Sequence, residues 1–370
     1  MLYIGLMSGT SLDGIDAALV EINQQGQPRL LTHHYQPYSP DLQKSLFQMS
    51  QNDHVRVLDL AQVDQQLGQL YAQCCFDLLD KTQYKPSDIH AIGCHGQTIR
   101  HQPRPGAFSL QIGDANQLAE LTGITTVADF RRRDIAAGGE GAPLVPAFHH
   151  YAFLNACSPR QILNLGGIAN ITILSPEVDK TFGFDLGPAN ALSNEWVEKH
   201  WQVNYDESGD LARSGQIQQD LLNQWLSLDY FDHLPPKSTG RELFNLDKFE
   251  QLTPEITSYK KEDVLASFIE LTAVSIKQGI ERWGYQTGEL FLCGGGSHNC
   301  YLVKRLQYHL PNLEIKKSDE LGIPVDMVEA TAFAWLAYRA INGLSGNLTT
   351  TTGAKGLRVL GAIYPGNLSL

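Results

Sequence analysis

A glycine-rich segment near the N-terminus combines residue types that can bind phosphate. Met7 to Asp16 reads Met-Ser-Gly-Thr-Ser-Leu-Asp-Gly-Ile-Asp, between two β-rich runs. Glycine lets the backbone approach a ligand and turn its N–H groups toward phosphate oxygens, and the hydroxyls add donors. The segment lacks the lysine-containing ending of a P-loop, so neutralising the phosphate charge would require a divalent cation. Asp13 and Asp16 can hold Mg²⁺ through its waters; an ordinary hairpin turn is the alternative.

Two further glycine motifs occur later in the chain. Leu163–Thr172 repeats the strand–turn–strand pattern around Gly166-Gly167, and Phe291–Asn299 runs from a strand through Gly294–Gly296 toward a helix. Two similar hairpins suggest two loops that bind one polyphosphate, although two unrelated turns would give the same pattern. The triple glycine can lie flat against a planar ring, and the helix start favours a nearby anion. Tight packing between strand and helix explains the triple glycine equally well.

Ionisable residues stand where strands are expected to end. Asp185 precedes a Gly-Pro turn and a helix, where a partly desolvated carboxylate can act as a general base. Helix capping or a structural salt bridge is its more ordinary role. His95, Arg131 and Glu329 also lie at junctions of apolar elements, where polar groups often line a cleft. A buried core histidine and a solvated arginine run are the alternatives for the first two.

These motifs need a scaffold of alternating strands and helices. Apolar residues at helical spacing predict an amphipathic helix over Val55–Leu79. The predicted strands are Tyr3–Met7, Ile15–Ile22, Leu30–Tyr35, His90–Cys94, Ser109–Ile112, the hairpin within Arg160–Leu174, and Glu289–Cys293. Further helices are predicted at Asp263–Trp283, Asn299–His309 and Met327–Asn342. Such interleaving indicates an α/β architecture.

The hairpin within Arg160–Leu174 repeats the strand–glycine turn–strand pattern of the N-terminus. We therefore expect a second domain to start there. We therefore expect domains at residues 1–158 and 159–370, with an active site in the cleft between them. A chain of 370 residues with 42% hydrophobic content also exceeds what one hydrophobic core usually serves.

Composition excludes several classes of partner. Lys and Arg total 28 against 40 acidic residues, and the net charge of −12 disfavours nucleic acid or a membrane surface as the main partner. The N-terminal run is broken at Ser8 and carries no Lys or Arg, so it does not resemble a signal peptide, and a cytoplasmic location is expected. The six cysteines show no metal-ligand spacing, which indicates reduced thiols.

The order of the motifs resembles the anhydro-N-acetylmuramic acid kinase family, within the superfamily of acetate and sugar kinases, heat-shock-cognate ATPases and actin. The shared segments are Met7–Asp16, Cys94–Thr98, Asp129–Arg131, Asn164–Asn170, Phe184–Pro188, Pro236–Glu242, Gly294–Asn299 and the Glu329-Ala330 helix. The resemblance implies a two-domain actin-like ATPase fold with duplicated ribonuclease-H-like cores and ATP in the interdomain cleft. A homodimer is also expected by resemblance.

The resemblance further implies residue roles. Asp185 would be the catalytic base. Phosphate and nucleotide contacts would come from Gly9, Thr10, Ser11, Leu12, Asp13, Gly14, Ile15, Asp16, Gly166, Gly167, Gly294, Gly295, Gly296 and Asn299. Sugar contacts would come from His95, Gln97, Thr98, Arg131 and Glu329. The cofactors implied are ATP and Mg²⁺, and the reaction is the opening of a 1,6-anhydro ring by water while ATP phosphorylates O6, as in cell-wall sugar recycling.

One motif departs from the family pattern. The base segment usually reads Asp-Thr-Gly-Pro-Gly-Asn, whereas this chain has Leu186 and Ala189 at the second and fifth positions. If the missing hydroxyl orients the base or the substrate, turnover or sugar preference would change. Two other functions remain open at this point: a kinase for an ordinary hydroxyl of another amino sugar, and a nucleotide-binding regulator without catalysis.

Overall fold

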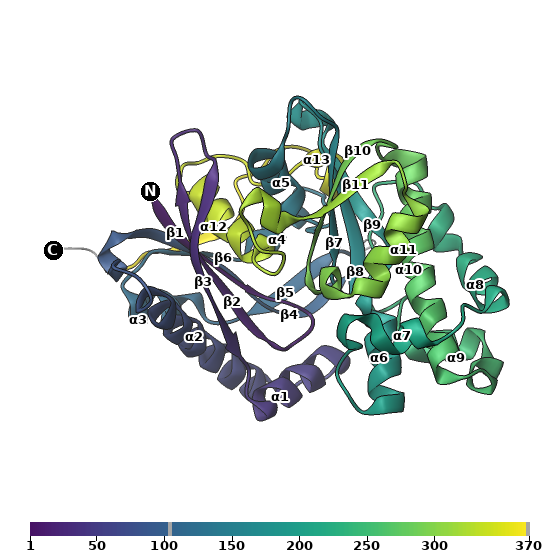
Figure 1. Ribbon diagram of the computed structural model, residues 1–370. Helices are drawn as coiled ribbons and strands as arrows, with labels where there is room; N and C mark the ends of the chain where they lie inside the picture. The colour runs from purple at the N-terminus through teal and green to yellow at the C-terminus, as the bar shows by residue number, and fades with distance from the viewer. Residues whose placement is uncertain (103–105, 368–370) are drawn as a thin grey trace. The chain divides into compact units, whose positions relative to one another are not determined.

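The computed structural model describes residues 1–102 and 106–367, and they form two compact units. Unit 1 comprises Met1–Phe153 together with the segment that begins at Met327, and unit 2 comprises Leu154–Asp326. Figure 1 shows the return of the chain: the yellow helix α12 (Val328–Ile341) belongs with the purple N-terminal strands. None of the helices in the described ranges combines the length and the apolar character that crossing a bilayer requires.

The sheet of unit 1 begins as an antiparallel meander and continues with parallel strands. The strand order is β12-β6-β4-β1-β2-β3, with β5 paired to β4. β1 pairs with β2 antiparallel and with β4 parallel, and β4 pairs with β6 parallel. The strands are β1 (Leu2–Ser8), β2 (Gly14–Ile22), β3 (Pro28–Pro37), β4 (Ile89–Gln102), β5 (Phe108–Ile112), β6 (Thr126–Ala128) and β12 (Ala362–Tyr364).

Helices cover both faces of this sheet. Alternate residues of β1 point to opposite faces: Ile4 and Leu6 join a core with Leu67 of α2, whereas Tyr3 packs edge-on against Tyr338 of α12. The helices of unit 1 are α1 (Pro40–Gln51), α2 (Val57–Leu79), α3 (Ala115–Thr122), α4 (Phe130–Ala136), α5 (Val145–Phe153), α12 and α13 (Thr349–Thr352). Because β1 is covered on both sides, its residues form an unbroken apolar run.

The C-terminal helix α12 is inseparable from this sheet. A methyl group at Gly5 of β1 would overlap the carbonyl of Ala330, and one at Gly93 of β4 would overlap that of Phe333. Glycine on the two central strands therefore allows α12 to lie directly on them. The division of the chain thus differs from the expected domains: residues from 327 onward belong to unit 1, whereas the prediction placed all of 159–370 in the second domain.

Unit 2 repeats the plan of unit 1. Its sheet has the order β11-β10-β7-β8-β9, with β7, β8 and β9 antiparallel and β10 parallel to both β7 and β11. The strands are β7 (Arg160–Leu165), β8 (Ile168–Ile173), β9 (Phe182–Pro188), β10 (Gly288–Cys293) and β11 (Leu313–Lys317). The same succession, a three-stranded meander followed by two parallel strands, occurs as β3-β2-β1-β4-β6 in unit 1. The prediction of a two-domain α/β protein with duplicated cores is confirmed.

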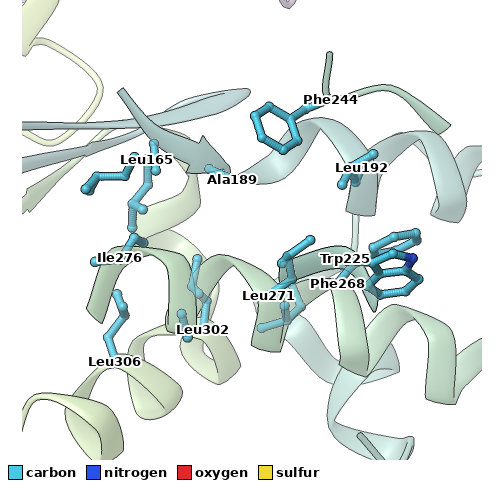
Figure 2. Packing of buried hydrophobic residues seen from close by; sticks show 14 of the residues in the cluster. Leu165, Ala189, Leu192, Trp225, Phe244, Phe268, Leu271, Ile276, Leu302 and Leu306 are labelled. Carbon is cyan, nitrogen blue, oxygen red and sulfur yellow. The ribbon is translucent and has the colours of Figure 1, made fainter. Parts of the chain in front are cut away.

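A large apolar core holds the helices of unit 2 against one another and against the sheet. Trp225 stacks on Phe268 with ring centroids 4.6 Å apart, and Figure 2 shows Phe244, Leu192 and Leu271 in the same cluster. The helices are α6 (Asn190–Trp201), α7 (Asp210–Ser214), α8 (Gln219–Leu226), α9 (Leu246–Leu252), α10 (Lys261–Trp283) and α11 (Cys300–His309). The predicted helices at 263–283, 299–309 and 327–342 are confirmed within two residues at each end.

Candidate functional site

The first glycine turn joins β1 to β2 and is open to solvent. Thr10, Ser11 and Asp13 are exposed, and a methyl group at Gly9 would meet nothing closer than Ser11 Oγ at 3.5 Å. Neither crowding nor positive φ therefore accounts for this glycine. Leu12 takes the left-handed conformation (φ 59°) and its N–H donates to the Gly9 carbonyl over 3.3 Å. In the described chain, the amides of Thr10 and Ser11 donate to no backbone carbonyl, so both can serve a ligand.

Acidic groups accompany this turn. The hydroxyl of Ser11 donates to Asp13 Oδ1 over 2.5 Å. Asp16 lies on β2 opposite Met7 and Tyr35. Burial raises the pKa of the Tyr35 hydroxyl to about 12, and the charges of Asp13 and Asp16 add to the shift. The described residues hold no group of three or more His, Cys, Asp and Glu side chains that could bind a metal directly, so a cation here would keep most of its water.

Buried side chains hold the first turn from behind. Gln97 is fully buried; its Nε2 donates to the Gly9 carbonyl over 2.9 Å, and its Oε1 accepts from Tyr38 Oη over 3.2 Å. Ser8 Oγ lies 2.6 Å from Tyr71 Oη and donates to the Gly96 carbonyl. Both ends of the Gln97 amide thus support the turn. Its expected contact with a sugar remains a prediction, without support from this geometry.

The other expected sugar contacts of unit 1 gather around one guanidinium. Arg131 donates from Nε and Nη2 to His95 Nε2 over 3.0 and 2.8 Å, and from Nη1 to the Gly141 carbonyl. These donors make Nε2 the acceptor, which places the ring proton on Nδ1. Burial, followed by the Arg131 charge, holds the pKa of His95 well below its ordinary value. His95 is therefore neutral and orients the arginine.

Glu329 interacts electrostatically with the same guanidinium. Burial raises the pKa of Glu329, and the charge of Arg131 opposes this rise. Burial lowers the pKa of Arg131 to about 10, and the charges of Glu329 and Asp134 oppose this fall. Thr98 lies nearby on β4, where its hydroxyl accepts from Gln111 Nε2 over 3.0 Å. His95, Arg131 and Glu329, separated by more than 230 positions in the sequence, are thus brought together.

The second glycine turn, Gly166-Gly167, joins β7 to β8 and is locked to the start of α6. The carbonyl of Gly167 accepts from the N–H groups of Ala189 (2.9 Å) and Ala191 (3.1 Å), and that of Gly166 accepts from Asn190 (3.0 Å). A methyl group at either glycine would meet only ordinary contacts, at 3.6 and 3.8 Å. In the described chain, the two glycine amides donate to no backbone carbonyl. The carbonyls fix the turn and the amides stay available to an anion.

Asp185 lies on β9 with its carboxylate almost fully buried, at 7% exposure. Oδ2 accepts from the Thr239 N–H over 2.9 Å and from Ser238 Oγ over 3.1 Å. Burial raises the pKa of Asp185 to about 6, although these two hydrogen bonds lower it. Among the described residues, both hydrogen bonds of the carboxylate end on Oδ2, so Oδ1 is left for another proton. Among the residues that the structure describes, the carboxylate of Asp185 forms no salt bridge.

The two unusual residues after Asp185 do not touch its carboxylate. Leu186 is 2% exposed and lies in the apolar core on the opposite face of β9, where it fills the space left by Gly279 of α10. Ala189 is buried at the start of α6 and bonds through its backbone. The leucine therefore contributes to packing, and Asp185 keeps its hydrogen-bond partners without the hydroxyl that the family pattern has at position 186.

The three glycines after β10 differ in the structural reason for having no side chain. A methyl group at Gly296 would come within 2.7 Å of Leu165 Cβ, and Gly294 has φ 78° and crowds Asn164. Gly295 is exposed, and nothing lies within 4 Å of a methyl group placed there. Asn299 caps α11, since its Oδ1 accepts from the Leu302 N–H over 2.9 Å. Packing thus explains two glycines, and Gly295 is the one that a planar ligand can approach.

Sequence reasoning missed the support of Asp185. Ser238 and Thr239 lie in the Pro236–Glu242 segment, which was singled out as a motif without a role. Lys237 precedes them, with Nζ 4.4 Å from the centroid of the Tyr230 ring and its pKa lowered to about 8 by burial. A Lys-Ser-Thr-Gly run outside any helix or strand was the available signal, because hydroxyls and free amides there suit an anion.

Comparison with known proteins gives consistent matches over nearly the whole chain. The model of a family described as anhydro-N-acetylmuramic acid kinase matches residues 1–366. An anhydro-N-acetylmuramic acid kinase of Xylella fastidiosa is 48% identical over 369 residues, which cover 98% of this chain and 96% of the relative. Those of Aliivibrio fischeri and Nitrosomonas europaea are 46% and 48% identical, with 99% of this chain and 99% and 100% of the relatives covered.

Proposed function

Because the chain belongs to the anhydro-N-acetylmuramic acid kinase family, we propose that Asp185 is the base with which it opens the 1,6-anhydro ring of 1,6-anhydro-N-acetylmuramic acid. The chain is a kinase that transfers a phosphoryl group to the sugar. With ATP as donor, the products are ADP and N-acetylmuramic acid 6-phosphate. The role that follows from this substrate is recycling of peptidoglycan sugars.

The observation that carries the proposal is the state of the Asp185 carboxylate. Its pKa of about 6 keeps it ionised at neutral pH and still makes it a stronger base than an exposed carboxylate. Two donors hold Oδ2, and Oδ1 can accept a proton from water.

The proposed reaction balances with one base and no protein acid. Water attacks C1, its oxygen forms the new C1–O bond, and its proton moves to Asp185 Oδ1. The C1–O6 bond breaks, and O6 attacks the γ-phosphorus while the bond to the ADP oxygen breaks. Glycoside hydrolysis normally needs an acid to protonate the leaving oxygen. Here the γ-phosphoryl group captures that oxygen instead.

Phosphate binding is assigned to the glycine turns. In unit 1 the open amides of Thr10 and Ser11 are the donors, and in unit 2 those of Gly166 and Gly167. Asp13 and Asp16 would hold Mg²⁺ through water, and the ion would neutralise charge on the phosphates. Gly295 is assigned to the nucleotide ring. The remaining predicted nucleotide contacts are backbone neighbours of these groups or serve as supports: Gly9, Leu12, Gly14, Ile15, Gly294, Gly296 and Asn299.

Sugar contacts are assigned to the Arg131 cluster. Arg131 offers a cation held in place by neutral His95, which suits the carboxylate that muramic acid carries. Glu329 balances this charge when no sugar is present. Thr98 is the neighbouring hydroxyl on β4.

The proposal is tested by ADP release with Mg²⁺-ATP and 1,6-anhydro-N-acetylmuramic acid, followed by mass analysis of the sugar. The expected product is heavier than the substrate by one phosphoryl group and one water. A product that gains the phosphoryl group alone would identify an ordinary hydroxyl kinase. Tight ATP binding without sugar-dependent ADP release would identify a regulator, and either result would overturn the proposal.

A further inference from the structure

The segment that supports Asp185 runs along the free edge of the sheet in unit 2. β9 is the last strand in the order β11-β10-β7-β8-β9, so its outer edge has no neighbouring strand among the described residues. The Asp185 N–H donates to the Lys237 carbonyl over 3.1 Å, and Tyr230 Oη donates to the Asp185 carbonyl over 2.8 Å. The backbone of Asp185 is therefore fixed on this side by residues outside the sheet.

The same segment also reaches the side chain. From Lys237, which accepts the Asp185 N–H, the chain turns so that Ser238 Oγ and the Thr239 N–H both point at Oδ2. Three bonds to one residue from three consecutive positions leave the carboxylate little freedom to rotate. Both hydrogen bonds to the carboxylate end on Oδ2. The favoured orientation of the carboxylate therefore directs Oδ1 away from residues 237–239.

We propose that Ser238 is a positioning residue for the base: with the Thr239 amide it occupies Oδ2, so that Oδ1 is the oxygen that takes the proton from water. The inference rests on the proposed function, since it assigns the geometry of the same base. Ser238 does not itself contact the reacting atoms in this account. It acts by holding the carboxylate in one orientation and by favouring its ionised form.

The charges that face Asp185 show what Ser238 contributes. Burial raises the pKa of Asp185, and the charge of Glu242 adds to the rise. The Thr239 amide, the Ser238 hydroxyl and the Lys237 charge oppose it. Tyr230 also faces the carboxylate, and its own pKa is raised by burial and by Asp185, so it stays neutral. Removing the Ser238 hydroxyl deletes one of the opposing contributions, and the pKa of Asp185 must rise.

The test is a titration of the Asp185 carboxyl carbon by ¹³C NMR in the unliganded full chain, paired with the pH profile of kcat/KM. Ser238→Ala should raise the pKa of Asp185 by about one unit, since a hydrogen bond to a charged group is worth about that much. The acid limb of kcat/KM should move upward by the same amount. Ser238→Thr keeps the hydroxyl and should restore both values.

Ser227→Ala is the matched control. Ser227 lies in the same unit, and its hydroxyl donates to the Gln224 carbonyl over 2.7 Å, away from the base. It should leave the titration and the profile unchanged. An Asp185 titration that does not move in Ser238→Ala would overturn the inference, whether or not the enzyme turns over. If the titration moves but the wild-type chain releases no ADP with the anhydro sugar, the support of the carboxylate stands and the proposed function fails.

Discussion

The two units share a strand order but hold their first turns in different ways. In unit 1 the turn after β1 spans Gly9 to Asp13 and is held from behind by the buried amide of Gln97. In unit 2 the turn after β7 has two residues, Gly166 and Gly167, and is held by N–H groups at the start of α6. Both arrangements leave backbone amides unused within the described chain: those of Thr10 and Ser11 in unit 1, and those of Gly166 and Gly167 in unit 2. The repeated core thus provides a glycine-containing turn in each unit, and each unit supports its turn with residues of its own.

The residues to which we assign chemistry lie in the parts of the two units that are not repeated. In unit 2 the edge strand β9 carries Asp185, and the segment between α8 and α9 supplies Ser238 and Thr239. In unit 1 the matching edge strand β3 is followed directly by α1 and α2. Instead, unit 1 gathers His95, Arg131 and Glu329. The proposed base thus belongs to unit 2, and the guanidinium that His95 orients belongs to unit 1.

The largest expected effect comes from Asp185→Asn. It should lower sugar-dependent turnover by about 10³-fold, within the range typical of a lost general base. Burial raises the pKa of Asp185 above its value in the unfolded chain. Ionisation therefore costs stability as pH rises, and a neutral amide should leave the unfolding midpoint unchanged or higher. Turnover and thermal unfolding are measured together.

The control for this variant is Asp179→Asn, an exposed carboxylate of the same unit. It should change neither turnover nor the unfolding midpoint. If turnover in Asp185→Asn stayed within tenfold of wild type, Asp185 would not be the base, and unit 2 would not differ from unit 1 by supplying one.

Two glycines after β10 allow a comparison within unit 2, because packing requires Gly296 but not Gly295. Gly296→Ala should lower the free energy of unfolding by about 1–3 kcal/mol, since the methyl group would crowd Leu165 and Asn190. Gly295→Ala should change it by less than about 0.5 kcal/mol, and Gly295→Val should raise KM for ATP while the fold is kept. Chemical denaturation and steady-state kinetics give the two readouts. Equal destabilisation by both alanine variants would reject the assignment of Gly295 to the nucleotide.

The pH dependence of the wild-type enzyme follows from the same carboxylate. Asp185 must be ionised to accept a proton, so kcat/KM should fall about tenfold per pH unit below about pH 6. Initial rates between pH 4.5 and about 8.5 would measure this limb. A limb at the pKa of an ordinary exposed aspartate would show that the base is not the buried Asp185.

The smallest effect on turnover is expected for Leu186→Thr, which restores the family pattern at this position. Leu186 faces the core and not the carboxylate. The variant should lose about 1–3 kcal/mol of stability through lost apolar burial, while kcat at a permissive temperature stays within about twofold. A large rise in kcat would mean that the hydroxyl acts on the base or the sugar after all.

Local patterns predicted much of the fold. The three strand–turn–strand and strand–helix motifs, and the long helices α2, α10, α11 and α12, follow from apolar periodicity and glycine, and their bounds agree closely with the structure. The return of α12 to unit 1 could not be predicted, because it depends on Gly5 and Gly93 accommodating a helix more than 230 positions away. Periodicity carries no information on which sheet a helix covers.

The candidate site, like the fold, could be predicted only where its signals are local. Asp185 and the open glycines have local signals, whereas the burial of Gln97 and the two hydrogen bonds to Asp185 Oδ2 depend on contacts between distant segments. Crowding at Gly296 likewise becomes visible only when Leu165 is beside it.

In the proposed reaction, water activated by Asp185 opens the anhydro ring while the phosphoryl group is transferred to O6. Turnover in ¹⁸O-water, with the position of the label read by mass fragmentation of the sugar 6-phosphate, tests it most directly. The account predicts one ¹⁸O at C1 and none in the phosphoryl group. A product without label at C1, or a label that enters the phosphoryl group, would contradict it.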